Sequence, residues 1–397
     1  MLPRPRTLPI VLAGFTAFLD LYATQPLLPL LMDVFGASHF DVSLTVTVAT
    51  IAVALAAPVV GRVGDLIGRK RVIVLSAFVL AGATAAAATA HSLPQFLFWR
   101  FVQGLATPGV FATTIAYIHD EWPAAYVGRT TAAYISGTVT GGFTGRALVG
   151  IVASRWNWQT AFVCLALVNV AAAFVMAATL PRERARDVVP AGGHRRSVMR
   201  LLRNRQLIAT DGVGLCVLFT QVAMFTYVTF LLSDPPYNLS TAALGWLFVV
   251  YLVGAAVTPV AGHLVDARGH RAGLASGVAI GVAGAFLTLV PWLPAIVAGL
   301  AMVATGVFIS QATASSYIGS VTSDDRGLAV GLYSTCYYAG GSLGGALPAL
   351  FWTTGGWTAC VALVVVVQLA TMMLALSFWR TRSRDLRISG SEDLRTS

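Results

Sequence analysis

Long apolar runs separated by short polar segments dominate the sequence. A membrane-spanning helix needs roughly 20 mainly apolar residues, and runs of this kind recur from one end of the chain to the other. The predicted spans cover residues 8–31, 42–60, 72–90, 94–118, 130–153, 158–180, 207–232, 241–261, 272–290, 294–318, 327–351 and 356–379. This pattern predicts an all-α membrane protein with about twelve transmembrane helices.

Composition favours lipid over water as the surrounding solvent. Of the 397 residues, 57% are hydrophobic and 11% are charged, whereas soluble domains have about 25% charged residues. The first run contains Asp20 and Gln25 and lacks a small-residue cleavage site. We therefore expect it to remain as the first span rather than to be removed as a signal peptide.

Basic residues gather on one side of the predicted membrane topology. With an even number of spans, nearly all Lys and Arg side chains fall on the side that holds both termini. The positive-inside rule makes that side the cytoplasm, in a bacterial-type inner (plasma) membrane. The net charge of +10 then reflects loops that face anionic lipid, so we expect membrane lipid and no nucleic acid as a partner.

The chain divides into two halves of six spans. The longest polar stretch lies between the sixth and seventh spans and is rich in arginine. The predicted parts are an N-terminal half at 1–180, a cytoplasmic linker at 181–206, a C-terminal half at 207–380 and a cytoplasmic tail at 381–397.

The two halves repeat each other. Residues 61–70 (GRVGDLIGRK) recur as residues 262–271 (GHLVDARGHR), with the Gly, Asp, Gly and final basic positions in register. A longer set matches at one constant offset. Its members are Gly128, Tyr134, Gly141, Gly142, Gly145 and Trp158, matched by Gly327, Tyr333, Gly340, Gly341, Gly344 and Trp357. This indicates a duplicated six-helix unit, a plan that places a transport site between the halves at mid-depth.

The repeated loop predicts a gate motif formed by Gly61, Asp65, Gly68 and Arg69, with Asp266 in the second copy. Glycine permits the tight turn between two spans. Asp65 can accept hydrogen bonds from a helix N-terminus or pair with an arginine. We interpret the motif as a brace between helices at the cytoplasmic gate; the alternative is a turn that only sets topology.

Asp20 is an ionisable residue near mid-depth of the first span. A charged side chain there costs about 2.5–3.5 kcal/mol on insertion scales, which makes it a functional candidate. Thr16, Asp20 and Thr24 recur every fourth residue and are predicted to share one helix face. We interpret Asp20 as a proton-coupling or cation-binding acid; the alternative is a structural ion pair with a nearby arginine.

Two arginines are the other deep charges. Arg100 shares a helix face with Gln103 and Thr107. It can modulate the pKa of a nearby acid, bind an anionic group or extend its side chain to the outer interface. Arg146 has Gly345 as its repeat counterpart, so packing alone does not account for it. Pairing with Asp20 and contact with substrate both stay open for Arg146.

The second half supplies uncharged polar and aromatic candidates. The predicted substrate cavity comprises Thr24, Gln103, Gln221, Tyr227, Tyr251, Gln311, Tyr333 and Tyr337, a mixture typical of binding sites. The sequence has no Walker loop and no nucleophile and base constellation, so we expect no enzyme. His119, Asp120 and Glu121 are adjacent and do not converge on a metal, so no metal site is predicted, and we interpret them as a solvated helix end.

Several motifs resemble those of the major facilitator superfamily. The loop 61–70 is similar to the superfamily signature, and residues 100–104 (RFVQG) resemble a motif of proton-coupled members. The stretches 141–146, 316–319 and 333–357 resemble the acriflavin-sensitivity (YnfM) branch of exporters. One departure is Gly142-Phe143, where the exporter motif has a Gly-Pro step. The resemblance covers nearly the whole chain and implies the major facilitator fold, alternating access and a central cavity.

These observations predict a secondary active transporter that exports a small organic compound or drug in exchange for protons. The proton gradient is the expected energy source, without a cofactor, and the expected partners are a small-molecule substrate and protons, with the chain acting as a monomer. The alternatives are an importer, symporter or uniporter of a metabolite such as a sugar, and a receptor that does not transport.

Overall fold

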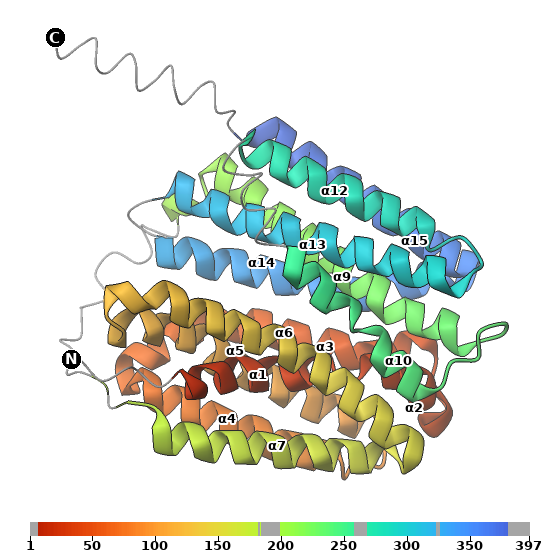
Figure 1. The fold of residues 1–397 in the computed structure, drawn as a ribbon, viewed down its shortest axis with the longest axis horizontal. Helices are drawn as coiled ribbons and strands as arrows, with labels where there is room; N and C mark the ends of the chain where they lie inside the picture. The colour runs from red at the N-terminus through yellow and green to blue at the C-terminus, as the bar shows by residue number, and fades with distance from the viewer. Residues whose placement is uncertain (1–6, 182, 184–198, 258–267, 323–325, 380–397) are drawn as a thin grey trace.

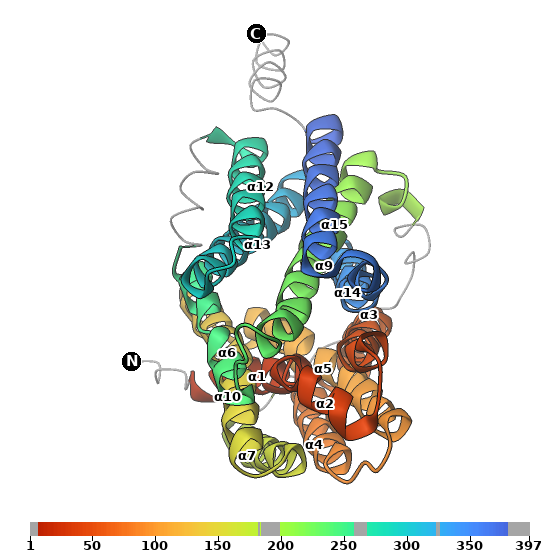
Figure 2. The same ribbon diagram turned by 90° about the vertical axis from the view of Figure 1, so that its right-hand side faces the viewer.

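The computed structural model describes residues 7–181, 183, 199–257, 268–322 and 326–379, and within these ranges the regular structure is helical. The helices form two groups that lie one above the other in Figures 1 and 2. The first group contains α1 (Leu8–Leu21), η1 (Gln25–Leu27), α2 (Leu28–Phe35), α3 (His39–Ile67), α4 (Arg69–Ala87), α5 (Leu93–Glu121), α6 (Ala124–Arg155) and α7 (Trp158–Thr179). The second contains α9 (Arg205–Ser233), α12 (His270–Leu287), α13 (Leu293–Val321), α14 (Arg326–Ala346) and α15 (Pro348–Phe378). Helix α10 (Thr241–Leu247) follows α9 in the chain but lies beside α6 of the first group (Figures 1 and 2).

The predicted all-α membrane fold is confirmed, with differences in detail. Among the described residues, nine helical segments are long and apolar enough to cross a membrane. The remaining predicted spans correspond to α6, α14 and the shorter apolar helix Thr241–Val257. Glycine and hydroxyl residues, and Arg146 in α6, lower the hydropathy of α6 and α14. Such residues are tolerated there because these helices pack against other helices along much of their length. Most of the predicted linker and the whole predicted tail lie outside the described residues.

The first predicted span corresponds to a membrane-crossing segment at Leu8–Phe35, but its helix is interrupted. Helix α1 ends at Leu21, and the chain passes through η1 before α2 begins. Pro26 lacks a backbone N–H and disfavours helical geometry in the residue before it. Thr24 lies beyond the end of α1, so the predicted face of Thr16, Asp20 and Thr24 does not continue past Asp20.

Glycines allow equivalent helix pairs to approach closely in the two halves. A Cβ added at Gly145 would meet the backbone of Leu19 in α1, and one added at Gly344 would meet the backbone of Phe219 in α9. The pairs α1/α6 and α9/α14 therefore pack in the same way, as small residues allow in membranes. The shared register makes Thr220 in α9 the counterpart of Asp20 in α1.

We expect Gly145→Ala to destabilise the protein by about 1–3 kcal/mol, the usual range for overpacking a tight contact. The new methyl group would push α1 away from α6 at the turn that carries Asp20. The matched control is Gly82→Ala in α4, where an added Cβ meets nothing within 4 Å. Thermal unfolding of the purified variants in detergent checks this; equal melting temperatures for Gly145→Ala and the control would contradict it.

The two halves contact each other through the corresponding helix pairs α3/α14 and α6/α10. We call the end of the bundle where α3 meets α4 and where α9 begins the basic side, and the other end the opposite side. Thr47 donates to the carbonyl of Ser342 at 3.2 Å, and the Thr50 and Ser342 hydroxyls are 3.0 Å apart. Gly150 of α6 lies against the backbone of Gly245. These contacts join the halves toward the opposite side.

Candidate functional site

Arg100 binds the main-chain carbonyls of Asp20 and Leu21 where α1 breaks, together with one carbonyl inside α3. Its guanidinium donates to the carbonyls of Asp20 at 2.9 Å, Leu21 at 2.6 Å and Thr45 at 3.1 Å, and to the Gln103 amide oxygen at 2.5 Å. Arg100 is fully buried. The carbonyls at the end of a helix lack intrahelical donors, and a planar guanidinium can reach several of them at once. Arg100 thus fixes the position of Asp20 through main-chain contacts.

The Asp20 carboxyl lies in a buried polar cluster. The Asn169 amide nitrogen in α7 donates to Asp20 Oδ2 at 2.5 Å, and the Thr84 hydroxyl in α4 lies 3.1 Å from the same oxygen. Gln103 in turn donates to Thr84 at 2.8 Å. Asp20, Asn169, Thr84 and Gln103 are each at most 1% exposed. Side chains from α1, α4, α5 and α7 therefore meet around one acid.

Two acceptor oxygens in this cluster have no donor among the described residues. They are the buried Asp20 Oδ1 and Asn169 Oδ1. The single Thr84 proton has a nearer acceptor in the Leu80 carbonyl, at 2.7 Å. A buried carboxylate normally receives several hydrogen bonds, whereas a protonated carboxyl needs fewer and supplies a donor of its own. The surroundings of Asp20 suit the protonated form.

Asp20 forms no ion pair with another described residue. Within the described ranges, ion pairs closer than 4.0 Å join Arg69 to Asp65 and to Asp120. Arg100 acts on Asp20 by its charge and by its contact with the Asp20 carbonyl. Arg146, which the sequence left open as a partner of Asp20, contacts other groups.

The second half has a polar but uncharged counterpart of this cluster. A small cavity between α9, α12, α13 and α15 is lined by Thr220, Ser310, Gln368 and Thr371 together with glycine and valine residues. Thr220 Oγ1 and Gln368 Nε2 have no partner among the described residues. Thr220 replaces Asp20 in the repeat, and Gln368 replaces Asn169. The ionisable group is therefore specific to the first half.

Arg146 lies where the two halves meet. Its Nε donates to the Gln25 amide oxygen at 2.8 Å, and its Nη1 donates to the carbonyl of Gly142 at 2.5 Å. Gln25 also donates to the Thr226 hydroxyl of α9 at 3.0 Å. Arg146 and Gln25 are each at most 2% exposed. Arg146 thus belongs to a contact between halves, separate from the Asp20 cluster.

The structure does not bring the predicted cavity residues together in one place. Gln103 belongs to the Asp20 cluster. Tyr251 lies beside Arg146, and the stacked rings of Tyr333 and Tyr337 are 5.9 Å apart in α14. Gln221 is partly buried on α9. Tyr227 donates to the Gly345 carbonyl at 2.8 Å and to Ser43 of α3 at 3.3 Å, toward the opposite side. Thr24 is fully buried, and Gln311 is partly buried on α13.

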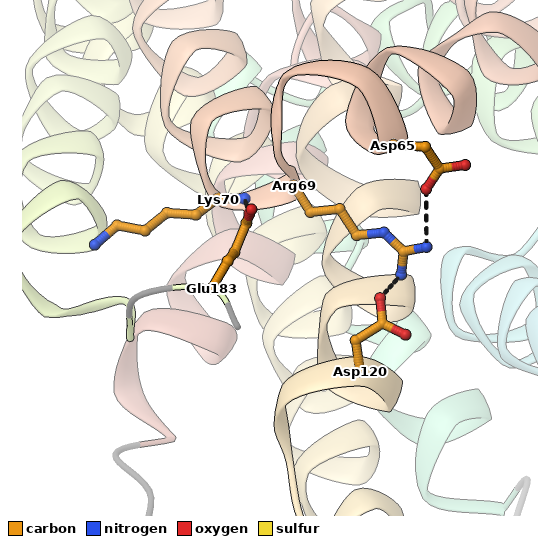
Figure 3. Close-up of polar contacts among 5 residues, drawn as sticks. All are labelled: Asp65, Arg69, Lys70, Asp120 and Glu183. Atoms are coloured by element: carbon orange, nitrogen blue, oxygen red, sulfur yellow. Dashed lines mark hydrogen bonds and ion pairs between the residues drawn. The ribbon is translucent and has the colours of Figure 1, made fainter. Parts of the chain in front are cut away.

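The first copy of the gate motif forms a brace inside the N-terminal half (Figure 3). Gly68 has a φ of 96°, which favours glycine at the turn. Arg69 pairs with Asp65 at 3.1 Å and with Asp120 at the end of α5. The sequence predicts a solvated helix end at Asp120, but its side chain is only 17% exposed, because Arg69 pairs with it.

The same loop also contacts the segment that follows α7 (Figure 3). The Lys70 backbone N–H donates to the Glu183 carboxylate, and Lys70 Nζ donates to the carbonyl of Leu180 at 2.5 Å. The brace therefore ties α3 and α4 to α5 and to the end of α7. Asp266, in the second copy, lies outside the described residues.

Sequence reasoning missed several residues that the structure brings to the site. They are Tyr22, Gln25, Thr84, Asn169 and Phe248. Asn169 is an isolated amide in an otherwise apolar span, and this signal could have identified it. Thr84 and Phe248 gave no such signal, because threonine and phenylalanine are common in packed transmembrane helices.

Comparison with known proteins gives one consistent family. The sequence model of the Major Facilitator Superfamily matches residues 10–235 and 213–397. The uncharacterized MFS-type transporter YybF of Bacillus subtilis is 30% identical over 369 residues, covering 92% of this chain and 90% of its own. The inner membrane transport protein YnfM of Escherichia coli is 30% identical over 370 residues, covering 91% and 88%.

Solved structures share the fold at low sequence identity. A bacterial homologue of the human lysosomal transporter Spinster, in an inward-facing and occupied conformation, has a TM-score of 0.78 at 15% identity and covers 96% of this chain and 97% of its own. The nucleoside transporter NupG has a TM-score of 0.75 at 14% identity, with coverage of 94% and 98%. These similarities establish the arrangement of the helices.

Proposed function

Because this chain belongs to the Major Facilitator Superfamily and is a multi-pass membrane transporter rather than an enzyme, we propose that it exports a small organic compound in exchange for protons. The proton gradient supplies the energy, and no cofactor takes part. Both termini and the basic side face the cytoplasm of a bacterial-type inner membrane, and lipid surrounds the bundle. One chain supplies both halves of the transport path, which supports a monomer.

The buried Asp20 carboxyl is the observation that carries proton coupling. Within the part of the chain that the structure describes, it has no ion-pair partner, and its Oδ1 and the Asn169 Oδ1 both lack a donor. A proton on Asp20 satisfies this environment. Loss of the proton leaves a negative charge on a side chain that is 1% exposed and that has one unambiguous donor, Asn169, which is unfavourable. Protonation of Asp20 therefore favours this closed cluster.

Asp20 also lies where a proton can influence the break in the first span. Arg100 binds the main-chain carbonyls of Asp20 and Leu21 at the end of α1. A negative charge on Asp20 attracts the guanidinium and competes with these carbonyls for it. Protonation and the position of the segment from Tyr22 to Leu27 are thus coupled. This segment contains Gln25, which contacts Thr226 of the second half.

Proton flux in inside-out vesicles tests this proposal. Vesicles with an acidic interior, prepared from cells with and without the protein, are given lipophilic cations, sugars or aromatic carboxylates while a pH-sensitive dye reports proton release. We expect at least one compound to release protons only when the protein is present, and to accumulate inside the vesicles as it does so. Protein-dependent transport of a compound without proton movement would show uniport and reject the coupling.

A further inference from the structure

The Arg146 guanidinium carries a positive charge that no carboxylate compensates among the residues the structure describes. The side chain is 2% exposed and comes from the middle of α6. Its two hydrogen bonds, to Gln25 and to the Gly142 carbonyl, involve neutral acceptors. Charges inside a membrane protein are normally paired or functional. This charge lacks a partner in the part of the chain that is described.

Aromatic rings surround the charge. The guanidinium carbon lies 5.0 Å from the ring centre of Tyr22, 4.6 Å from that of Phe248 and 5.0 Å from that of Tyr251. Such contacts stabilise a cation only partly, even when it is removed from water. We call Tyr22, Gln25, Arg146, Phe248 and Tyr251 the Arg146 site.

Unused hydrogen-bond donors remain in the Arg146 site. A guanidinium has five N–H donors, and the contacts with Gln25 and Gly142 use one on Nε and one on Nη1. The Tyr22 hydroxyl is buried and has no partner within the described ranges. Two groups that can donate to an anionic oxygen are therefore close together, since Tyr22 also lies against the guanidinium.

We propose that the Arg146 site binds the substrate, and that the substrate is an organic anion with a carboxylate attached to an aromatic body. The carboxylate pairs with the Arg146 guanidinium and accepts from the Tyr22 hydroxyl, because a guanidinium fits a carboxylate in a bidentate manner. The aromatic body packs against Phe248 and Tyr251. This inference rests on the proposed transport function and specifies its substrate class.

The location of the Arg146 site fits a substrate that controls the contact between halves. Tyr22, Gln25 and Arg146 belong to the first half, and Phe248 and Tyr251 belong to the second. In this structure the rings close directly on the guanidinium. Separation of the halves would withdraw two of the three rings and leave the charge open to an anion. A cationic substrate would be repelled, which argues against lipophilic cations at this position.

Binding of three ligands of similar shape to the purified full-length protein tests the proposal. The ligands are 2-naphthoate, 2-naphthamide and 2-naphthylmethylamine, which are anionic, neutral and cationic, and calorimetry measures their affinity in detergent. We expect the carboxylate to bind at least tenfold more tightly than the other two. Arg146→Gln should remove this preference, and Arg146→Lys should keep part of it. The matched control Arg155→Gln, an exposed arginine at the end of α6, should bind as wild type does.

The outcomes separate the substrate class from the transport function. Binding of the amide as tight as that of the carboxylate, no binding of the carboxylate, or an unchanged preference in Arg146→Gln overturns the proposal for the Arg146 site. If the proposal for the Arg146 site fails in this way, proton release driven by compounds other than organic anions would still support proton-coupled transport. Conversely, selective naphthoate binding together with transport that moves no protons would retain the anion site and reject proton coupling.

Discussion

Asp20→Asn is expected to reduce compound-driven proton release to the level of vesicles without the protein, while the protein stays folded. Asparagine cannot exchange a proton. Its amide can still form a reciprocal pair with Asn169. Its oxygen accepts from the Asn169 nitrogen, and its own nitrogen can donate to Asn169 Oδ1, which has no donor among the described residues. The variant therefore imitates the protonated carboxyl, and we expect it to melt at or above the wild-type temperature.

Three measurements on the same variant check this expectation. The dye assay reports proton release, thermal unfolding in detergent reports stability, and exchange of labelled compound across vesicles without a gradient reports substrate movement. We expect only the first to be lost. The matched control is Asp33→Asn, an exposed acid in α2, which should behave as wild type in all three.

The opposite pattern would support the alternative role for Asp20. If Asp20 remains ionised to compensate the charge of Arg100, then asparagine leaves that charge without its partner. The variant would then melt at a lower temperature and lose substrate exchange together with proton release. Proton release equal to that of wild type would instead place the coupling group elsewhere in the chain.

The helices and the repeat could be predicted because they depend on local pattern. A span is visible as an apolar run, and the glycines that let α6 approach α1 recur in α14 at a constant offset. The break after Leu21 was missed, although Pro26 marks it, because the apolar run continues to Leu31. One proline hardly changes the hydropathy of a long apolar run. The same proline removes a backbone donor and so interrupts the hydrogen bonding of the helix.

The partners of the deep charges could not be predicted, because they depend on helix rotation and depth. Asp20, Arg100 and Arg146 were identified as candidates from their presence in apolar runs. Their partners, such as Asn169 in α7 and Phe248 near α10, are distant in sequence and are ordinary residues by composition. Only packing shows that Arg100 binds main-chain carbonyls at the helix break and that Arg146 lies at the contact between halves.

Arg100→Gln is expected to lower the free energy of unfolding by on the order of 3 kcal/mol, the range found when one partner of a buried polar network is removed. The substitution removes the donor that Arg100 supplies to the carbonyls of Asp20, Leu21 and Thr45. The Asp20 carbonyl keeps the Ala23 N–H at 3.1 Å and Thr45 lies inside α3, so the main loss falls on the Leu21 carbonyl at the end of α1. Unsatisfied carbonyls are expensive where no water can replace the lost donor. We expect a melting temperature lower by roughly 5 °C or more.

Arg100→Lys should not restore stability, because the arrangement needs a planar fork rather than a charge alone. The guanidinium reaches three main-chain carbonyls and the Gln103 oxygen through three nitrogens, whereas lysine presents one nitrogen. The control Arg155→Gln should have the same melting temperature as the wild type. Rescue by lysine would mean that Arg100 acts through its charge on Asp20. Failure of lysine to rescue, with proton release lost in both variants, would mean that the geometry of the helix break holds Asp20 in place for proton exchange.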